Sequence, residues 1–153
     1  MPDANDLIRE HYSHAIAVHT RLFPGVVDAL SRLTGSGYRI GICTNKPEGL
    51  AEDLMQRLGV RDVFGALTGA DTLPVRKPDP EHLRETVRRL GCDPALSCLI
   101  GDSDTDRNTA RNAGVPSVLV TFGPSGEDMA ALAPEALLER YEDLPDLVDR
   151  LLA

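Results

Sequence analysis

Six residues that follow one short apolar run carry three carboxylates. The run Cys98-Leu99-Ile100 leads into Gly101-Asp102-Ser103-Asp104-Thr105-Asp106 and then into a helical pattern. Carboxylates this close together repel one another unless a cation holds them, and Asp102 and Asp106 can both face one point at the start of that helix. Mg²⁺ prefers hard oxygen ligands and takes one or two carboxylates together with waters and substrate phosphate. The segment therefore predicts a magnesium site on Asp102 and Asp106.

Helix capping is the alternative role for these aspartates. Asp104 or Asp106 could accept hydrogen bonds from the N–H groups of the first helical turn, where negative charge is also favourable. A calcium loop shares the alternating aspartates, but Arg107 stands where such a loop needs glycine and Ala113 where it needs glutamate. The magnesium and capping interpretations both stay open on the residues alone.

A rigid segment, Val75-Arg76-Lys77-Pro78-Asp79-Pro80, carries the second candidate. Pro78 and Pro80 fix their own φ angles and bias the preceding residues away from helix, so the side chains between them are well aimed. Lys77 and Lys46 are the only lysines among 16 basic residues, and each directly precedes a proline. A lysine retained where arginine serves elsewhere indicates that a compact point charge is needed.

The third candidate is the pair Thr44-Asn45, which lies between an apolar run and the helical pattern that starts near Pro47. A hydroxyl, a side-chain amide and unpaired backbone N–H groups at a helix N-terminus are suited to bind phosphate. Ordinary capping of the helix by Thr44 and Asn45 is an equally open alternative.

Each candidate directly follows or precedes an element of a predicted α/β sheet. Short apolar runs alternate with longer amphipathic stretches, a pattern typical of parallel strands joined by crossover helices. Ligands bind at the carboxyl ends of such strands, which is where the candidates lie. We expect strands at Tyr38 to Cys43, Ala66 to Thr68, Ser97 to Ile100, Ser117 to Val120 and Ala136 to Leu138. We expect helices at Gly25 to Leu33, Pro47 to Leu58, Pro80 to Leu90, Asp104 to Ala113 and Pro145 to Leu152.

A polar helix over Asp6 to Thr20 precedes the first strand and carries His11, His14 and His19. Without an acidic or cysteine partner, these histidines indicate a solvated helix face more than a metal site. The residues after this helix form one domain of ordinary size.

Composition limits the partners of the chain. The net charge of −8 and a pI near 4.9, without any basic run, argue against nucleic acid, although a bound cation could still attract a small anion. No stretch approaches the roughly 20 apolar residues of a membrane span, and the N-terminus resembles no signal peptide. Three cysteines without a Cys-x-x-Cys pair indicate neither a disulfide framework nor zinc. We expect a cytoplasmic protein.

In their order along the chain, Thr44-Asn45, Arg76 to Pro80 and Gly101 to Asp106 resemble motifs II, III and IV of the haloacid dehalogenase superfamily. The resemblance runs from about Phe23 to the C-terminus, and Thr72-Leu73-Pro74 is most similar to the phosphoglycolate phosphatases of that superfamily. It implies an α/β fold, a Rossmannoid three-layer sandwich with a mainly parallel sheet. It also implies a Mg²⁺-dependent phosphatase of small phosphorylated metabolites.

The resemblance also implies roles for single residues. Thr44 would hydrogen-bond the transferring phosphoryl group, and the region of Asn45 would help to position it. Lys77 would hold the phosphoryl group and the nucleophile together. Asp102 would bind Mg²⁺ directly, and Asp106 would support the metal.

One family motif is not found in the sequence. Members open with a strand that ends in Asp-x-Asp-Gly-Thr, whose first aspartate is the nucleophile, and residues 1–153 contain no such segment. By resemblance, residues 1–20 would be the remnant of a helical cap domain, and residues 21–153 the core domain without its nucleophile strand. The strands ending at Cys43 and Ile100 would then either pair directly or stay apart and favour self-association through exposed edges.

Two functions from different classes fit these residues. The first is a phosphatase whose covalent step requires the motif that residues 1–153 lack, so that activity of the chain alone is doubtful. The second is a non-catalytic phosphate- or metal-binding module, or a fragment that depends on a partner. A phospho-receiver domain is disfavoured because Lys77-Pro78 precedes the acidic cluster. A dehalogenase needs no metal and would leave Asp102 and Asp106 without a role.

Overall fold

Short strands alternate with helices along the described chain. The computed structural model describes residues 25–121 and 126–152. The strands are β1 Gly41–Cys43, β2 Ala66–Thr68, β3 Leu99–Gly101, β4 Ser117–Val120 and β5 Ala136–Leu138. The helices are α2 Val26–Gly35, α3 Glu48–Arg57, α4 Pro80–Arg89, α5 Asp104–Ala113 and α6 Leu144–Leu152. Short 3₁₀ turns lie at Arg61–Val63, Pro94–Leu96, Gly126–Leu132 and Tyr141–Asp143.

The predicted elements are confirmed within two or three residues at their ends. Three strands and the helix Asp104–Ala113 coincide with the prediction. The strand predicted from Tyr38 begins only at Gly41, because the amide of Tyr38 instead bonds to the carbonyl of Leu33 and closes α2. The predicted helix Asp6 to Thr20, its histidines and the proposed cap remnant 1–20 lie outside the described residues, so that division of the chain stays a prediction.

The strands form two parallel ladders, β1–β2 and β3–β4–β5. Ile42 pairs with Leu67, Ile100 with Val118, and Leu119 with Leu137. A parallel pair needs a crossover, and α3 supplies it between β1 and β2 and α5 between β3 and β4.

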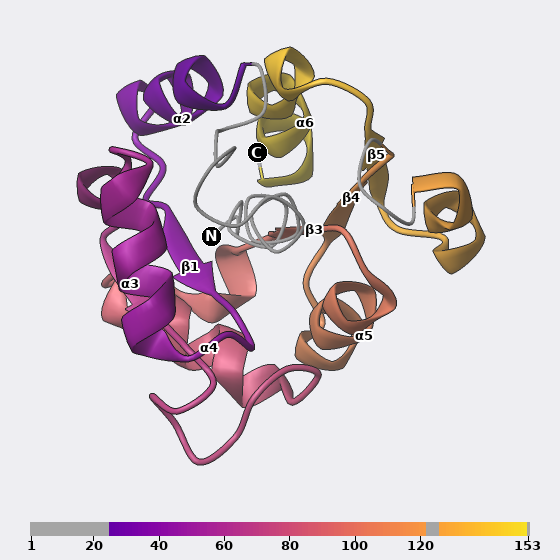
Figure 1. Ribbon diagram of the computed structural model, residues 1–153. Coiled ribbons are helices and arrows are strands. Elements are labelled where there is room, and N and C mark those ends of the chain that lie inside the picture. The colour runs from indigo at the N-terminus through magenta and orange to yellow at the C-terminus, as the bar shows by residue number, and fades with distance from the viewer. Residues whose placement is uncertain (1–24, 122–125, 153) are drawn as a thin grey trace.

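Apolar side chains alternate between two cores, one on each face of the strands. Ile42, Leu67 and Ile100 belong to the core that α2, α3 and α6 cover. Cys43 and Leu99, one position away in the chain, belong to the core formed with α4 and α5. Figure 1 shows α2 and α6 above the strands and α4 and α5 below them. The predicted three-layer α/β sandwich with parallel strands is therefore confirmed.

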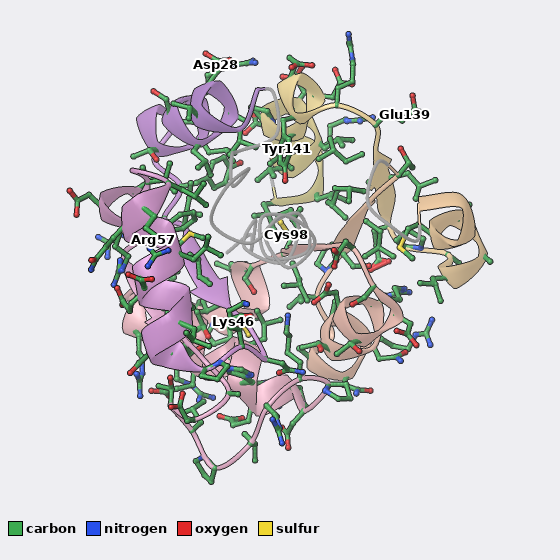
Figure 2. All side chains as sticks on the ribbon, in the orientation of Figure 1. Asp28, Lys46, Arg57, Cys98, Glu139 and Tyr141 are labelled. Carbon is green, nitrogen blue, oxygen red and sulfur yellow. The ribbon has the colours of Figure 1, made fainter. Side chains whose placement is uncertain are left out.

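The picture of all side chains agrees with this layering. Cys98 and Tyr141 point into the interior, whereas Asp28 and Glu139 lie on the outside (Figure 2). Burial raises the pKa of the Cys98 thiol to about 11, so this cysteine is an unreactive core residue.

The neighbouring strands β1 and β3 do not pair within residues 25–121 and 126–152. Direct closure of the two, one of the predicted alternatives, is therefore not the arrangement adopted. All residues of both strands are nevertheless buried in the single chain. Self-association through these strand edges stays a prediction.

None of the helices in the described ranges is long and apolar enough to cross a bilayer.

Helix α4 buries two polar side chains, His82 and Thr86, beside its apolar Leu83 and Val87. Burial first, and then the positive charge of Lys77, lower the pKa of His82 to about 4. The carbonyl of Thr68 and the carboxylate of Asp79 oppose this shift more weakly. His82 is therefore a neutral imidazole at neutral pH.

A pair of leucines on α3 tests the packing of this helix. Leu54 is 1% exposed and Leu50 is 59% exposed. Leu54→Ala should lower the free energy of unfolding by about 2 to 5 kcal/mol, because it removes buried volume from the core. Leu50→Ala should change it by less than about 0.5 kcal/mol. Urea unfolding of both variants measures the difference, and equal effects would show that α3 does not dock through the face described.

A second prediction concerns the pH dependence of stability. The folded pKa of His82, about 4, lies below its ordinary value of 6.5 in an unfolded chain. Stability that depends on a neutral His82 is therefore complete above about pH 6.5 and is lost as pH falls toward about 4. In urea unfolding over this range, the free energy of unfolding should fall more steeply with decreasing pH for wild type than for His82→Asn. The difference in slope should correspond to the uptake of up to about one proton on unfolding. Parallel profiles would mean that the imidazole is not held neutral.

Candidate functional site

A buried ion pair joins the segment after β2 to the first turn of α5. Lys77 Nζ lies 2.7 Å from Asp106 Oδ1, and both side chains are only 1% exposed. Taking two charges out of water is costly, and an excellent mutual geometry with further hydrogen bonds is needed to offset that cost. The structure thus brings together two residues that the sequence placed in different motifs.

The second oxygen of Asp106 is held by the residues just before it. Asp106 Oδ2 accepts hydrogen bonds from the amide of Asp102 and the hydroxyl of Ser103, each at 3.0 Å. A Cβ on Gly101 would lie 2.3 Å from Asp106 Cγ, so only glycine lets this carboxylate fold against the end of β3. The segment Gly101 to Asp106 is therefore built around the Asp106 carboxylate.

The N-cap of α5 is Ser103, whose hydroxyl also accepts a hydrogen bond from the amide of Asp106 at 3.3 Å. Asp106 therefore does not cap α5. Asp104 Oδ1 does accept a hydrogen bond from an amide of the first helical turn, that of Thr105 at 2.9 Å, but the N-cap position is occupied by Ser103. The two flanking aspartates, Asp102 and Asp106, are buried, whereas Asp104 is exposed.

Asp102 and Asp106 are the two residues expected to hold Mg²⁺. Asp102 is 4% exposed and lies directly after β3, where ligands of a parallel sheet bind. No group of three or more acidic, histidine or cysteine side chains with metal-ligand geometry occurs among the described residues. Mg²⁺ usually takes one or two protein carboxylates and completes its shell with waters and phosphate. The buried carboxylate of Asp102 fits that requirement, whereas both oxygens of Asp106 already accept from Lys77, Asp102 and Ser103.

Thr44 lies directly after β1 and is 0% exposed. Its hydroxyl accepts a hydrogen bond from the amide of Lys46 at 3.1 Å. The N-cap of α3 is Pro47, and the first amide of that helix, on Glu48, donates to Asp71 Oδ1 at 2.8 Å. Capping of α3 by Thr44 or Asn45 is therefore wrong.

Asn45 connects the end of β1 to the backbone of Lys77. Its Oδ1 accepts from the Lys77 amide and its Nδ2 donates to the Lys77 carbonyl, both at 3.0 Å. The side-chain amide is thus directed at Lys77 itself. Asn45 can fix the backbone from which the Lys77 side chain extends, and this is a positioning role.

Two parts of the site could not be read from the motifs. His82 Nδ1 also accepts from the Lys77 amide, at 3.1 Å. Behind it, the hydroxyl of Thr86 donates to the His82 carbonyl at 2.8 Å and lies 2.5 Å from the hydroxyl of Thr68. The available signal was that His82 and Thr86 share the inward face of α4 with Leu83 and Val87.

Hydrogen bonds connect most of the predicted residues. Asn45, next to Thr44, bonds to the backbone of Lys77, the Lys77 ammonium bonds to Asp106, and Asp106 accepts from the amide of Asp102. Lys46 lies at the carboxyl end of β1 (Figure 2), but it is half-buried, whereas Lys77 is 4% exposed. The ammonium of Lys77 lies 2.7 Å from the carboxylate of Asp106. The arrangement therefore brings a cation together with a buried carboxylate, while the buried Thr44 lies directly after β1 and the buried Asp102 directly after β3.

Comparison with known proteins supports a family assignment. The model of the family described as haloacid dehalogenase-like hydrolase matches residues 2–120. A phosphoglycolate phosphatase of Mesorhizobium japonicum is 40% identical over 147 residues, which are 95% of this chain and 65% of that relative. The enzyme of the same name from Agrobacterium fabrum is 38% identical over 144 residues, 94% of this chain and 62% of the relative. The chain thus spans less than two thirds of the length of these relatives.

A solved structure gives the same result for the fold. The crystal structure of a protein from Haemophilus somnus, described as a predicted phosphoglycolate phosphatase, superposes with a TM-score of 0.80 at 26% identity and covers 90% of this chain and 61% of that one. The family model covers well over half of the 153 residues. On this evidence, the chain belongs to the haloacid dehalogenase-like hydrolases.

Proposed function

We propose that this chain carries the phosphate- and metal-binding part of a Mg²⁺-dependent phosphatase that acts on a small phosphorylated metabolite. The observation that carries the proposal is the buried pair of Lys77 and Asp106 beside Asp102 at the carboxyl ends of the strands. A cation with two carboxylates in one buried place is what binding of a phosphoryl group together with Mg²⁺ requires.

Each residue has a distinct task in this proposal. The Thr44 hydroxyl donates a hydrogen bond to a phosphoryl oxygen. The Lys77 ammonium neutralises charge on the same group, and a compact point charge suits this task. Asp102 ligates Mg²⁺ directly, and Asp106 orients both the Lys77 ammonium and the Asp102 amide that it binds. When bound, Mg²⁺ supplies Lewis-acid stabilisation of the phosphoryl charge.

Phosphoglycolate is the substrate we propose. The support is the similarity to phosphoglycolate phosphatases at about 40% identity. A location in the cytoplasm, where small phosphorylated metabolites occur, belongs to the same proposal.

The attacking group requires a separate proposal. In the family the nucleophile is the first aspartate of Asp-x-Asp-Gly-Thr, and residues 1–153 contain no such segment. We therefore assign the covalent step to an aspartate outside this sequence. The alternative function, a non-catalytic phosphate- or metal-binding module or a partner-dependent fragment, is favoured by the same observation.

Replacement of Lys77 tests the phosphate site. Lys77→Ala should lower the affinity for inorganic phosphate by about 10- to 100-fold, the effect of one lost hydrogen bond to a charged group. Lys77→Arg should not restore the affinity, because the planar guanidinium of arginine does not replace the compact ammonium of lysine. Isothermal titration in the presence of MgCl₂ measures the affinity. The matched control is Arg76→Ala, which removes the same charge from the adjacent exposed residue.

Loss of Lys77 also leaves a carboxylate buried without its cation, which costs about 3 to 5 kcal/mol of stability. The double variant Lys77→Met/Asp106→Asn removes both charges and should recover stability without recovering phosphate binding. Phosphate affinity equal to wild type in Lys77→Ala would exclude Lys77 from the site.

Addition of the missing motif tests the catalytic proposal. A chain extended by a strand that ends in Asp-x-Asp-Gly-Thr should hydrolyse phosphoglycolate at least about a thousandfold faster than the 153-residue chain, the usual scale for loss of a covalent nucleophile. The control is the same extended chain with the first aspartate of the motif changed to asparagine. Mg²⁺-dependent turnover by the 153-residue chain at about 1 per second or faster, abolished by Asp102→Ala, would overturn the assignment of the nucleophile.

A further inference from the structure

Side chains from three separate elements hold the backbone around Lys77. Asn45, which follows β1, bonds to both the amide and the carbonyl of Lys77. His82, in the first turn of α4, accepts from the same amide at 3.1 Å. Asn112, near the end of α5, donates to the carbonyl of Pro78 at 3.1 Å. The segment is thus fixed from the sheet and from both helices on that face.

Among these contacts, the one from His82 is the deepest. His82 is 0% exposed, whereas Asn45 is half-buried and Asn112 is exposed. An acceptor that faces an N–H must be an unprotonated nitrogen, so the contact fixes the imidazole with its proton on Nε2. Burial keeps the imidazole neutral, since it lowers the pKa of His82.

The position of His82 is itself fixed by neighbouring groups. The hydroxyl of Thr86, one helical turn later, donates to the carbonyl of His82. That hydroxyl also lies 2.5 Å from the hydroxyl of Thr68, at the end of β2. The contact to Lys77 is therefore anchored on the sheet through α4, and it does not depend on a mobile surface side chain.

We propose that His82 is a positioning residue for the phosphate site, because its neutral imidazole holds the Lys77 amide so that the ammonium reaches Asp106. This inference rests on the proposed function of Lys77. A lysine has four rotatable side-chain bonds, so the aim of its ammonium depends on how well its backbone is fixed. The hydrogen bond of His82 is to the amide of Lys77, so its effect on the ammonium passes through the backbone of Lys77.

Two substitutions separate the hydrogen bond from the volume of the side chain. His82→Asn retains an acceptor at nearly the place of Nδ1. His82→Leu has almost the shape of asparagine without the acceptor. The matched control is Leu83→Ala, which removes buried volume from the adjacent residue of α4 and cannot bond to the Lys77 amide.

Two readouts are expected to change together in His82→Leu. Hydrogen exchange of the Lys77 amide should become about 2- to 10-fold faster, the change that one net hydrogen bond corresponds to. The affinity for inorganic phosphate, measured by titration calorimetry with MgCl₂, should fall by about the same factor. His82→Asn should stay within about twofold of wild type in both. Leu83→Ala should lower the melting temperature but leave both readouts within about twofold.

The outcomes distinguish this inference from the proposed function. Failure of the wild-type chain to bind phosphate would contradict the proposed function. Hydrogen exchange of the Lys77 amide would still decide the role of His82. Unchanged exchange in His82→Leu would overturn the positioning role, as would equal losses in Leu83→Ala. If His82→Leu does not fold, long-range ¹H–¹⁵N correlation spectra of the wild-type histidine decide the question. A proton on Nδ1 at neutral pH would refute the inference.

Discussion

The buried ion pair between Lys77 and Asp106 is the interaction on which the rest of the site depends. Two opposite charges in a place that is nearly inaccessible to water are tolerated only when each is neutralised and hydrogen-bonded. Asp106 meets this condition, since its carboxylate accepts from the Lys77 ammonium, the Asp102 amide and the Ser103 hydroxyl, and Asn45 and His82 fix the backbone from which the Lys77 side chain extends. The loops after two different ladders are therefore coupled through one pair of charges.

The parallel strands explain why these loops meet. Each of β1, β2 and β3 ends at the same edge, and each following segment must turn there into a helix. Small residues make the turns possible. Gly69 passes so close to the amide of Glu48 that a Cβ would lie 2.4 Å from it, and Gly101 leaves room for the Asp106 carboxylate. The geometry of the site is thus a consequence of sheet topology together with a few residues without side chains.

The family and the chemistry of this chain rest on different kinds of evidence. Membership of the haloacid dehalogenase-like hydrolases follows from a match over residues 2–120 and from the shared fold. Function depends on the groups at the site, and a fold by itself does not supply them. In the function proposed here, the described residues bind a phosphoryl group and a metal, whereas the attacking group is assigned to a motif that the sequence does not contain.

The sequence by itself determined the elements and the residues of the candidate site. Alternating apolar runs and helical patterns are local signals, so strands such as Ala66–Thr68 and the helix Asp104–Ala113 could be predicted with their bounds. The same patterns identified Thr44, Lys77, Asp102 and Asp106, because polar residues after a buried strand stand out against their surroundings. Gly59, Gly91 and Gly114, which follow α3, α4 and α5, have positive φ (74°, 75° and 72°), the conformation that a helix end favours locally.

Only the tertiary structure decided which groups contact one another. The ion pair joins residues 29 positions apart, and the bonds of Asn45 to Lys77 join residues 32 positions apart. Such contacts depend on how ladders and helices pack, which no local pattern encodes. For the same reason only the structure could decide the open alternatives for the helix caps: Ser103 is the N-cap of α5, and Asp71 rather than Thr44 or Asn45 binds the first amide of α3. It also explains why His82 could be placed on the inner face of α4 by pattern, whereas its bond to Lys77 required the packed fold.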